Sequence, residues 1–278
     1  MVILLAAIVL WLAPGRIVST APAATEILFA LGLGPRVVGV TQFCNYPPEA
    51  KTKPRVGTFL QPNLEVILRL RPDLVVIQKN PVRLGERLEA MGLKTVEVDQ
   101  PSVEAVFDSI RRIGGAAGVP ARAMEMERRL RGELEAIRQR AAALPPRRAM
   151  FVVGRTPNAL EGLVAVGQGS YLNELMTLAG GRNVFGDAGA AYPRIGLEEV
   201  LARNPEVIID MGEMADTIGV TEKQKQAVVA LWNRYPMLSA VRNKRVYAVA
   251  SDIFVVPGPR IVEAAREFAR MLHPEAGF

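Results

Sequence analysis

The chain has 278 residues, half of them hydrophobic and 22% charged, so it folds into one or two globular domains and is not intrinsically disordered. The formal net charge is +6, but the basic residues are scattered and no run of them alternates with aromatic residues, which argues against nucleic-acid binding. With only Cys44 and His273, an internal disulfide and a Cys/His zinc site are excluded, and a catalytic triad is disfavoured.

Residues 2–13 form an uninterrupted apolar run, VILLAAIVLWLA. As a helix this run spans about 18 Å, too short for the ~30 Å hydrocarbon core of a membrane. Its length is typical of the apolar region of a secretory signal, so we predict that residues 1–14 are a signal peptide. The alternative is that the run forms the first buried element of the mature fold.

Residues 15–101 are predicted to form an N-terminal lobe in which short apolar strands alternate with helices. The predicted strands are 16–19, 37–40, 74–77 and 95–98, and the predicted helices are 25–31, 63–70 and 82–91. This alternation favours a parallel sheet. A helical linker follows over residues 102–146. Within it, apolar residues recur every three or four positions from 120 to 144, which predicts a rod of roughly 36 Å that ends at Pro145 and stiffly joins two lobes.

Residues 147–278 are predicted to form a C-terminal lobe of the same α/β class, and part of it repeats the first lobe. VGTFLQPNLEVILRLRPDLVVI (56–77) aligns with RIGLEEVLARNPEVIID (194–210) at an offset of 133 positions, which pairs Glu65 with Glu198. Two fainter pairs, 88–100 with 238–252 and 25–34 with 173–181, keep the same order. We therefore expect two related α/β lobes, although any two α/β units share some of this rhythm.

Ligands of open α/β sheets bind beyond the carboxyl ends of the strands, where the loops of this chain are rich in aromatic residues. These loops carry Phe43, Tyr46, Phe59, Gln78, Arg155, Tyr192, Arg194 and Phe254. Apolar walls with a few polar groups suit a bulky organic ligand. Packing of each side chain against its own lobe is the alternative. The loops hold neither a paired carboxylate nor a Gly-rich phosphate cradle, so we expect no catalytic residues.

An ordered set of segments resembles the periplasmic binding proteins that serve ABC importers of cobalamin, haem and ferric siderophores. The segments are STAPAATEILFALGLGPRVVGV, NYPPEA, VGTFLQPNLEVILRLRPDLVV, GQGSYLNELMTLAGGRNVF and SDIFVVPGPRIVEAA. The chain is most similar to the cobalamin-binding branch. The resemblance implies two Rossmann-like lobes joined by one long helix and a corrinoid ligand held in the cleft between them. It also implies a periplasmic monomer that is not an enzyme, has no further cofactor or metal, and delivers its ligand to an ABC permease.

The resemblance also assigns residues. The family's ligand-facing positions match Phe43, Phe59, Gln78, Tyr192 and the loop Asp252, Ile253, Phe254, Val255 and Val256; Tyr46 and Arg155 complete the predicted ligand-binding set from the loop analysis. Its two permease-docking acids match Glu65 and Glu198. Taken alone, each of these acids also has a simpler explanation, since a first-turn acid stabilises a helix by about 0.3–1 kcal/mol.

The identity of the ligand is left open by two departures from the cobalamin branch. Where that branch can have Trp in the cleft, this chain has Phe59, Gln78 and Ile253, and the loop 155–166 is longer than expected. A ferric-siderophore or haem receptor is the main alternative, and it would be favoured by convergence of Arg55, Arg83, Arg155, Arg194 and Arg260. An α/β enzyme of two similar lobes is a weaker one.

Overall fold

A computed structural model describes residues 13–212 and 220–278, so the predicted signal peptide lies almost entirely outside the described residues. The chain divides into two compact units. The N-terminal unit comprises the residues up to 99 together with 108–127, and the C-terminal unit comprises 100–107 together with 128–278. The division therefore falls within two helices of the predicted linker. In the described part of the chain, no helix is both long and apolar enough to span a membrane.

The N-terminal unit is built on a four-stranded sheet in the order β2-β1-β3-β4, with every neighbouring pair parallel. The strands are β1 (Ile17–Ser19), β2 (Val37–Val40), β3 (Leu74–Gln78) and β4 (Thr95–Val98). β1 and β3 are the central strands and are almost wholly buried, as expected for strands covered on both faces.

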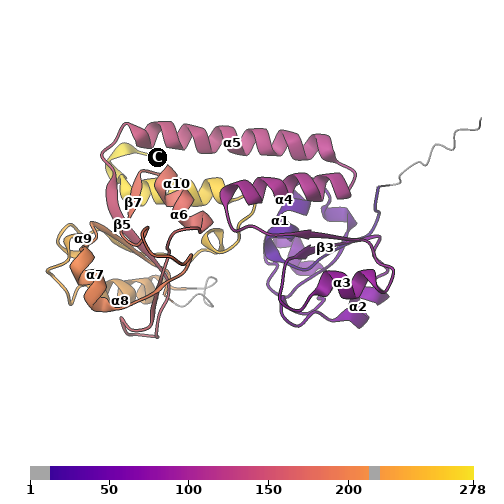
Figure 1. The fold of residues 1–278 in the computed structure, drawn as a ribbon, viewed down its shortest axis with the longest axis horizontal. Coiled ribbons are helices and arrows are strands. Elements are labelled where there is room, and N and C mark those ends of the chain that lie inside the picture. Colours follow the sequence, from indigo (N-terminus) through magenta and orange to yellow (C-terminus); the bar gives the residue numbers. More distant parts are fainter. Residues whose placement is uncertain (1–12, 213–219) are drawn as a thin grey trace, which may run out of the picture. The chain divides into compact units, whose positions relative to one another are not determined.

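Helices cover both faces of this sheet (Figure 1). They are α1 (Pro22–Ala30), α2 (Leu64–Arg69), α3 (Leu84–Glu89) and the part of α4 (Val103–Ala116) from residue 108 onward. On one face, Val18, Val75 and Ile77 pack with Ile67 of α2 and Leu84 of α3. Because side chains alternate along a strand, the intervening residues of β1 and β3 face α1 on the other side.

The C-terminal unit contains a larger sheet in the order β10-β9-β5-β6-β8, with β7 also paired to β5. The strands are β5 (Arg147–Gly154), β6 (Leu163–Ala165), β7 (Gly181–Asn183), β8 (Arg194–Ile195), β9 (Val207–Asp210) and β10 (Val246–Ala248). The expected parallel arrangement holds for β7, β5, β9 and β10. The correction concerns β6 and β8, which are antiparallel. The connection from β5 to β6 is too short for the crossover that a parallel pair requires.

Two sets of helices sandwich the C-terminal sheet (Figure 1). On one side, α7 (Leu197–Arg203), α8 (Glu222–Trp232) and α9 (Ser239–Arg242) pack against Met150 and Val152. On the other side lie α6 (Tyr171–Leu178) and α10 (Ile261–Leu272). The C-terminal half of α5 (Pro120–Ala142) runs beside α10, with Arg266 3.6 Å from Glu133.

The repeat predicted from the sequence is present in the strand pairing. In the N-terminal unit, β1 pairs with β3 so that Ile17 lies opposite Leu74. In the C-terminal unit, β5 pairs with β9 so that Ala149 lies opposite Val207. In both units the helix of the repeat, α2 or α7, precedes the second strand of that pair and covers the same face of the sheet.

Candidate ligand-binding site

The loop after β2 presents Phe43 and Tyr46 at the carboxyl edge of the N-terminal sheet, where their side chains are 58% and 43% exposed. Cys44 anchors the loop from within, because its Sγ lies 3.1 Å from the hydroxyl groups of both Thr25 and Thr41. Burial raises the pKa of the Cys44 thiol, which therefore stays protonated. Arg55 adds a second anchor by donating to the carbonyl of Thr41 at 2.8 Å.

The next loop, 57–62, presents Phe59 and Leu60. Gly57 has a φ of +95°, and a Cβ there would lie 2.3 Å from the Gln61 carbonyl, so this turn requires glycine. The Thr58 N–H donates to that same carbonyl at 3.0 Å and closes the turn. Phe59 is half-buried and Leu60 is 56% exposed.

The two loops of the N-terminal unit lie side by side, and each exposes large apolar side chains. The Gln42 N–H donates to the Gly57 carbonyl at 3.1 Å, which joins them. Asn80, just after β3, donates to the Phe59 carbonyl at 3.4 Å, and Gln78 is the half-buried last residue of that strand. The structure thus gathers the predicted residues Phe43, Tyr46, Phe59 and Gln78 at the carboxyl edge of one sheet. It adds Leu60, which was not predicted from the sequence although it directly follows the predicted residue Phe59.

In the C-terminal unit, the loop Asp252–Val256 is held from two sides. The Tyr171 hydroxyl donates to the Phe254 carbonyl, and the Arg260 guanidinium lies 2.8 Å from the Asp252 carboxylate. The Phe254 ring packs edge-on against Phe151 and Phe268 in the core, so it supports the loop from below. Ile253 and Val256 are buried and Val255 is half-buried.

Tyr192 lies close enough to Tyr171 for its charge to affect the pKa of that residue. Burial raises the pKa of Tyr171 well above its usual value, and the charge of an ionised Tyr192 raises it further. Tyr192 itself is 45% exposed, and partial burial raises the pKa of its phenol as well. Both phenols are therefore neutral hydrogen-bonding groups at physiological pH. Tyr171 was not among the predicted residues, yet its hydroxyl binds the loop Asp252–Val256 and its pKa responds to the charge of Tyr192.

Arg155 lies in a buried ion pair instead of on an open loop. Its Nε is 3.0 Å from Oδ2 of Asp210, and the two side chains are 4% and 0% exposed. Trp232 donates to the same carboxylate oxygen at 2.7 Å, and the Gly212 N–H donates to the other oxygen at 2.7 Å. Asp210 is thus surrounded by donors, and Arg155 holds the start of the loop after β5.

The two predicted docking acids occupy the same position of equivalent helices. Glu65 is in the first turn of α2, where its side chain is 85% exposed and lies 2.9 Å from Arg69 one turn later. Glu198 is in the first turn of α7 and is also exposed. The residue equivalent to Arg69 is Ala202, and the next residue, Arg203, pairs with the neighbouring Glu199.

Among the described residues, no group of three or more His, Cys, Asp or Glu side chains could hold a metal ion. His273 is fully buried at the end of α10, beside Gly180. The Gly180 carbonyl accepts from the Arg147 N–H at the start of β5, so His273 lies at the amino edge of the C-terminal sheet. The loop Asp252–Val256 follows β10, at the opposite edge.

Comparison with known families gives a match to the periplasmic binding protein model over residues 17–253, which covers all the strands described above. The chain belongs to the periplasmic binding protein family. It is 31% identical to the vitamin B12-binding protein of Salmonella typhimurium over 275 residues, which cover 98% of this chain and 96% of that one. It is 30% identical to the vitamin B12-binding protein of Vibrio cholerae, covering 92% and 88% of the two chains.

Solved structures of this family share the fold. The vitamin B12-binding protein BtuF of Vibrio cholerae superposes with a TM-score of 0.77 at 28% identity, covering 94% of this chain and 98% of that one. The haem-binding protein RhuT from Roseiflexus gives the same TM-score and coverage at 27% identity. These neighbours are two-lobed binding proteins, in agreement with the fold class predicted from the sequence.

Proposed function

We propose that this protein is an extracytoplasmic receptor that binds a corrinoid and delivers it to an ABC permease. In this proposal the ligand contacts the apolar loops of the N-terminal unit and the loops around Tyr192 and Asp252–Val256 of the C-terminal unit. The protein acts as a monomer in the periplasm and has no enzymatic activity. Residues 1–14 direct its export.

The observation that carries the proposal is that two loops joined by a hydrogen bond expose the apolar side chains of Phe43, Tyr46 and Leu60, which we call the apolar surface. Groups of large apolar side chains at a protein surface mark sites that bind a protein, a membrane or a ligand, and ligand pockets are lined mainly by such side chains. The two loops are fixed by Gly57, Cys44 and Arg55, so the surface is formed before any ligand arrives. Relatives named as vitamin B12-binding proteins, at 30–31% identity over nearly the whole chain, support a corrinoid as the ligand.

The state of the arginines also favours a corrinoid over an anionic ferric siderophore. Five arginines were candidates for a cationic pocket, and four of them already have partners within their own unit. Arg55 binds loop carbonyls and Arg83 lies 2.5 Å from Glu86. Arg155 pairs with Asp210 and Arg260 with Asp252. Arg194 is exposed and has no side-chain hydrogen bond or ion pair within residues 13–212 and 220–278. A receptor for an anionic ligand would need more uncommitted cations than this.

Haem is the second candidate, and Tyr192 is the residue that favours it. An exposed tyrosine can ligate haem iron, and the similarity to the haem-binding protein RhuT is nearly as high as that to BtuF. Two features argue against haem. The raised pKa of Tyr192 disfavours the phenolate that would bind iron, and His273 lies at the other edge of the sheet from the loop Asp252–Val256.

Isothermal titration calorimetry against cobalamin, cobinamide, haem and a ferric siderophore tests the assignment. We expect saturable one-to-one binding of cobalamin, with cobinamide close to it and with haem and siderophore at least about 100-fold weaker. Tight haem binding that Tyr192→Phe abolishes would establish the second candidate. If none of the four compounds bound, both the corrinoid assignment and the haem assignment would be contradicted.

Delivery to the permease is tested by uptake. Glu65 and Glu198 are the proposed contacts to permease arginines, because both are exposed acids at equivalent places on the two units. Replacing both with alanine is expected to abolish uptake of cobalamin while its affinity is retained. Normal uptake by the double variant would show that docking does not depend on these acids.

A further inference from the structure

The two helices that carry the proposed docking acids are too short to hold their own geometry. α2 has 6 residues and α7 has 7. Isolated helices shorter than about 12 residues are marginal in water, and the last carbonyls of any helix have no partner within it. Whatever fixes the ends of α2 and α7 therefore also fixes the direction in which Glu65 and Glu198 point.

In the N-terminal unit, Arg16 fixes the end of α2 to the first strand. Its Nε and Nη2 both donate to the carbonyl of Leu70, the C-cap of α2, at 2.9 and 2.7 Å. Its backbone N–H donates to the carboxylate of Asp73 at 2.9 Å, and the Asp73 N–H donates back to the Arg16 carbonyl at 2.8 Å. We call this set, formed by Arg16, Leu70 and Asp73, the N-terminal clasp.

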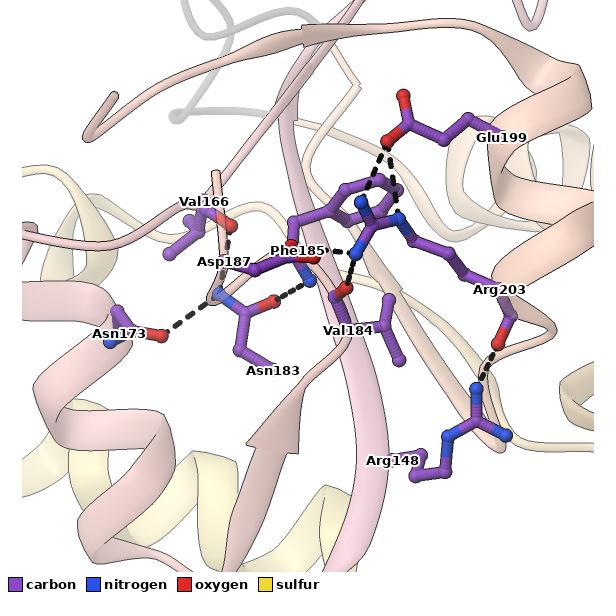
Figure 2. Close-up of polar contacts among 9 residues, drawn as sticks. All are labelled: Arg148, Val166, Asn173, Asn183, Val184, Phe185, Asp187, Glu199 and Arg203. Carbon is purple, nitrogen blue, oxygen red and sulfur yellow. Dashed lines mark hydrogen bonds and ion pairs between the residues drawn. The ribbon is translucent and has the colours of Figure 1, made fainter. Parts of the chain in front are cut away.

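The C-terminal unit contains the same arrangement, built from Arg148, Arg203 and Glu206. Arg148 Nη2 donates to the carbonyl of Arg203, the last residue of α7, as Figure 2 shows. The Arg148 N–H donates to the Glu206 carboxylate at 2.9 Å, and the Glu206 N–H donates back to the Arg148 carbonyl at 2.8 Å. We call this set the C-terminal clasp. Leu70 and Asp73 align with Arg203 and Glu206 at the offset that also relates the two docking acids.

Each clasp ties a surface helix to a central strand. Arg16 immediately precedes β1 and Arg148 lies in β5, and both strands are paired on two sides. The acid is an aspartate, Asp73, in one clasp and the longer glutamate, Glu206, in the other. Both carboxylates nevertheless accept a hydrogen bond from the backbone N–H of the clasp arginine. Three of the four hydrogen bonds of the N-terminal clasp recur in the C-terminal one, which lacks only the second guanidinium donor. We infer that an arrangement kept in two units with different neighbouring side chains serves something that the units have in common. The docking helix is the element that the clasp touches.

We propose that Arg16 and Arg148 are positioning residues for permease docking. Each fixes the carboxyl end of the helix whose amino end carries a docking acid, so that Glu65 and Glu198 are held in one orientation on the sheet. This inference rests on the proposed docking function. Neither arginine is proposed to contact the ligand or the permease.

The C-terminal unit offers a matched control for the charge of Arg148. Arg182 is its register partner on β7, so both side chains lie on the same face of neighbouring strands. Arg182 is exposed, and its side chain makes no hydrogen bond or ion pair with the part of the chain that the structure describes. Arg148→Met and Arg182→Met therefore remove the same charge from the same area, but only the first breaks the clasp. Arg148→Lys keeps the charge and one donor to the Arg203 carbonyl.

The experiment compares these three variants and Glu198→Gln in the full-length mature protein. The readouts are cobalamin affinity by calorimetry, hydrogen–deuterium exchange of α7, and association with the organism's own cobalamin permease in detergent. We expect Arg148→Met to speed exchange in α7 by roughly five- to tenfold, the effect of losing about one hydrogen bond. We also expect it to weaken permease association severalfold at unchanged cobalamin affinity. Arg182→Met should match the wild type, and Arg148→Lys should lie between them.

The outcomes separate the clasp from the docking function. If Glu198→Gln weakens association but Arg148→Met does not, docking stands and the positioning role of Arg148 is overturned. If Arg182→Met weakens association as much as Arg148→Met does, the charge matters and the clasp does not. If Glu198→Gln has no effect on association, the docking function fails, and this inference fails with it. If Arg148→Met lowers cobalamin affinity in parallel with association, the role of Arg148 is general stability.

Discussion

The two units hold an acid at the same place on the same short helix, but they surround it differently. In the N-terminal unit, Glu65 is paired with Arg69 of its own helix. In the C-terminal unit, the position equivalent to Arg69 is Ala202. The next residue, Arg203, pairs with Glu199 and Asp187 and stacks on the Phe185 ring at 4.8 Å (Figure 2). The comparison shows that the backbone contacts of the clasps are shared between the units, whereas the side-chain pairs around the acids are not.

A second difference lies inside the sheets. Asp210, the last residue of β9, aligns with Ile77 near the end of β3. Both are fully buried, but one is an apolar core residue and the other an anion held by Arg155 and Trp232. The C-terminal unit thus contains a buried ion pair at a position where the N-terminal unit has only apolar core packing.

The largest expected effect is on stability, from breaking that buried ion pair. Asp210→Ala leaves the Arg155 guanidinium buried without its partner, and we expect the C-terminal unit to lose about 3–5 kcal/mol of unfolding free energy in urea titrations. Arg155→Met combined with Asp210→Leu should cost clearly less than the single change, because no charge is left unpaired. A single variant as stable as the wild type would show that the ion pair contributes little.

The next effect concerns the docking acids. A hydrogen bond to a charged group contributes about 1.5–3 kcal/mol, so losing one at a permease arginine should lower association roughly 10- to 100-fold. Glu198→Ala is expected to have the larger effect. Glu65 must first give up Arg69, and an exposed pair of this spacing contributes about 0.3–0.5 kcal/mol, or roughly a factor of two. Arg69→Met should therefore strengthen docking slightly, and a weaker complex in that variant would contradict this view of Glu65.

The aromatic surface should give a smaller, ligand-specific effect. Phe59→Ala and Tyr192→Ala are each expected to weaken cobalamin binding by more than about fivefold, since aromatic anchors dominate such contacts. Met124→Ala is the control, because Met124 is an apolar side chain of α5 that is 61% exposed but lies on no candidate loop. Calorimetry checks all three. Equal affinities of wild type and Phe59→Ala would remove the N-terminal loop 57–62 from the site.

The smallest effect is a dependence on pH, and it differs between the units. Each unit contains a deeply buried weak acid, Cys44 or Tyr171, whose pKa is raised in the folded state. Below the unfolded pKa both states are protonated, so there is no penalty. As the pH rises through that value, the unfolded chain ionises while the folded one does not, and stability falls.

For Cys44 this loss begins near pH 9.0, whereas for Tyr171 it begins near pH 10.0. Urea titrations between pH 8 and 11 should therefore show the N-terminal unit weakening first. Cys44→Ala should remove the earlier decline but leave the later one. A decline that starts at the same pH in the Cys44→Ala variant would have another origin.

Much of the fold could be predicted from the sequence because the relevant signals are local. The Pro72 and Pro205 stops, the β-branched runs and the fixed offset between the repeats identified β3, β9 and the helices before them. The candidate loops followed from the rule that ligands bind at the carboxyl edge of a parallel sheet. The roles of the individual side chains in those loops are still predictions.

What the sequence did not reveal depends on contacts between distant residues. Asp210 could not be matched with Arg155, 55 positions away, because nothing in either segment signals a partner. The clasps could not be predicted for the same reason. In the sequence, Arg16 and Arg148 resemble any other surface arginine, and only the folded strands place them beside the end of a helix. β6 and β8 are too short and too irregular to give a strand pattern.

Fluorescence of the Trp232 side chain can report on unfolding of the C-terminal unit alone. The sequence has one other tryptophan, Trp11, within the predicted export signal. A mature chain starting after residue 14 would therefore emit indole fluorescence from a single fully buried ring beside the Asp210 carboxylate. A change in that emission during denaturation reports melting around β9 and α8, whereas circular dichroism averages over the whole chain. Non-coincident curves from the two probes would reveal that the halves come apart in separate steps.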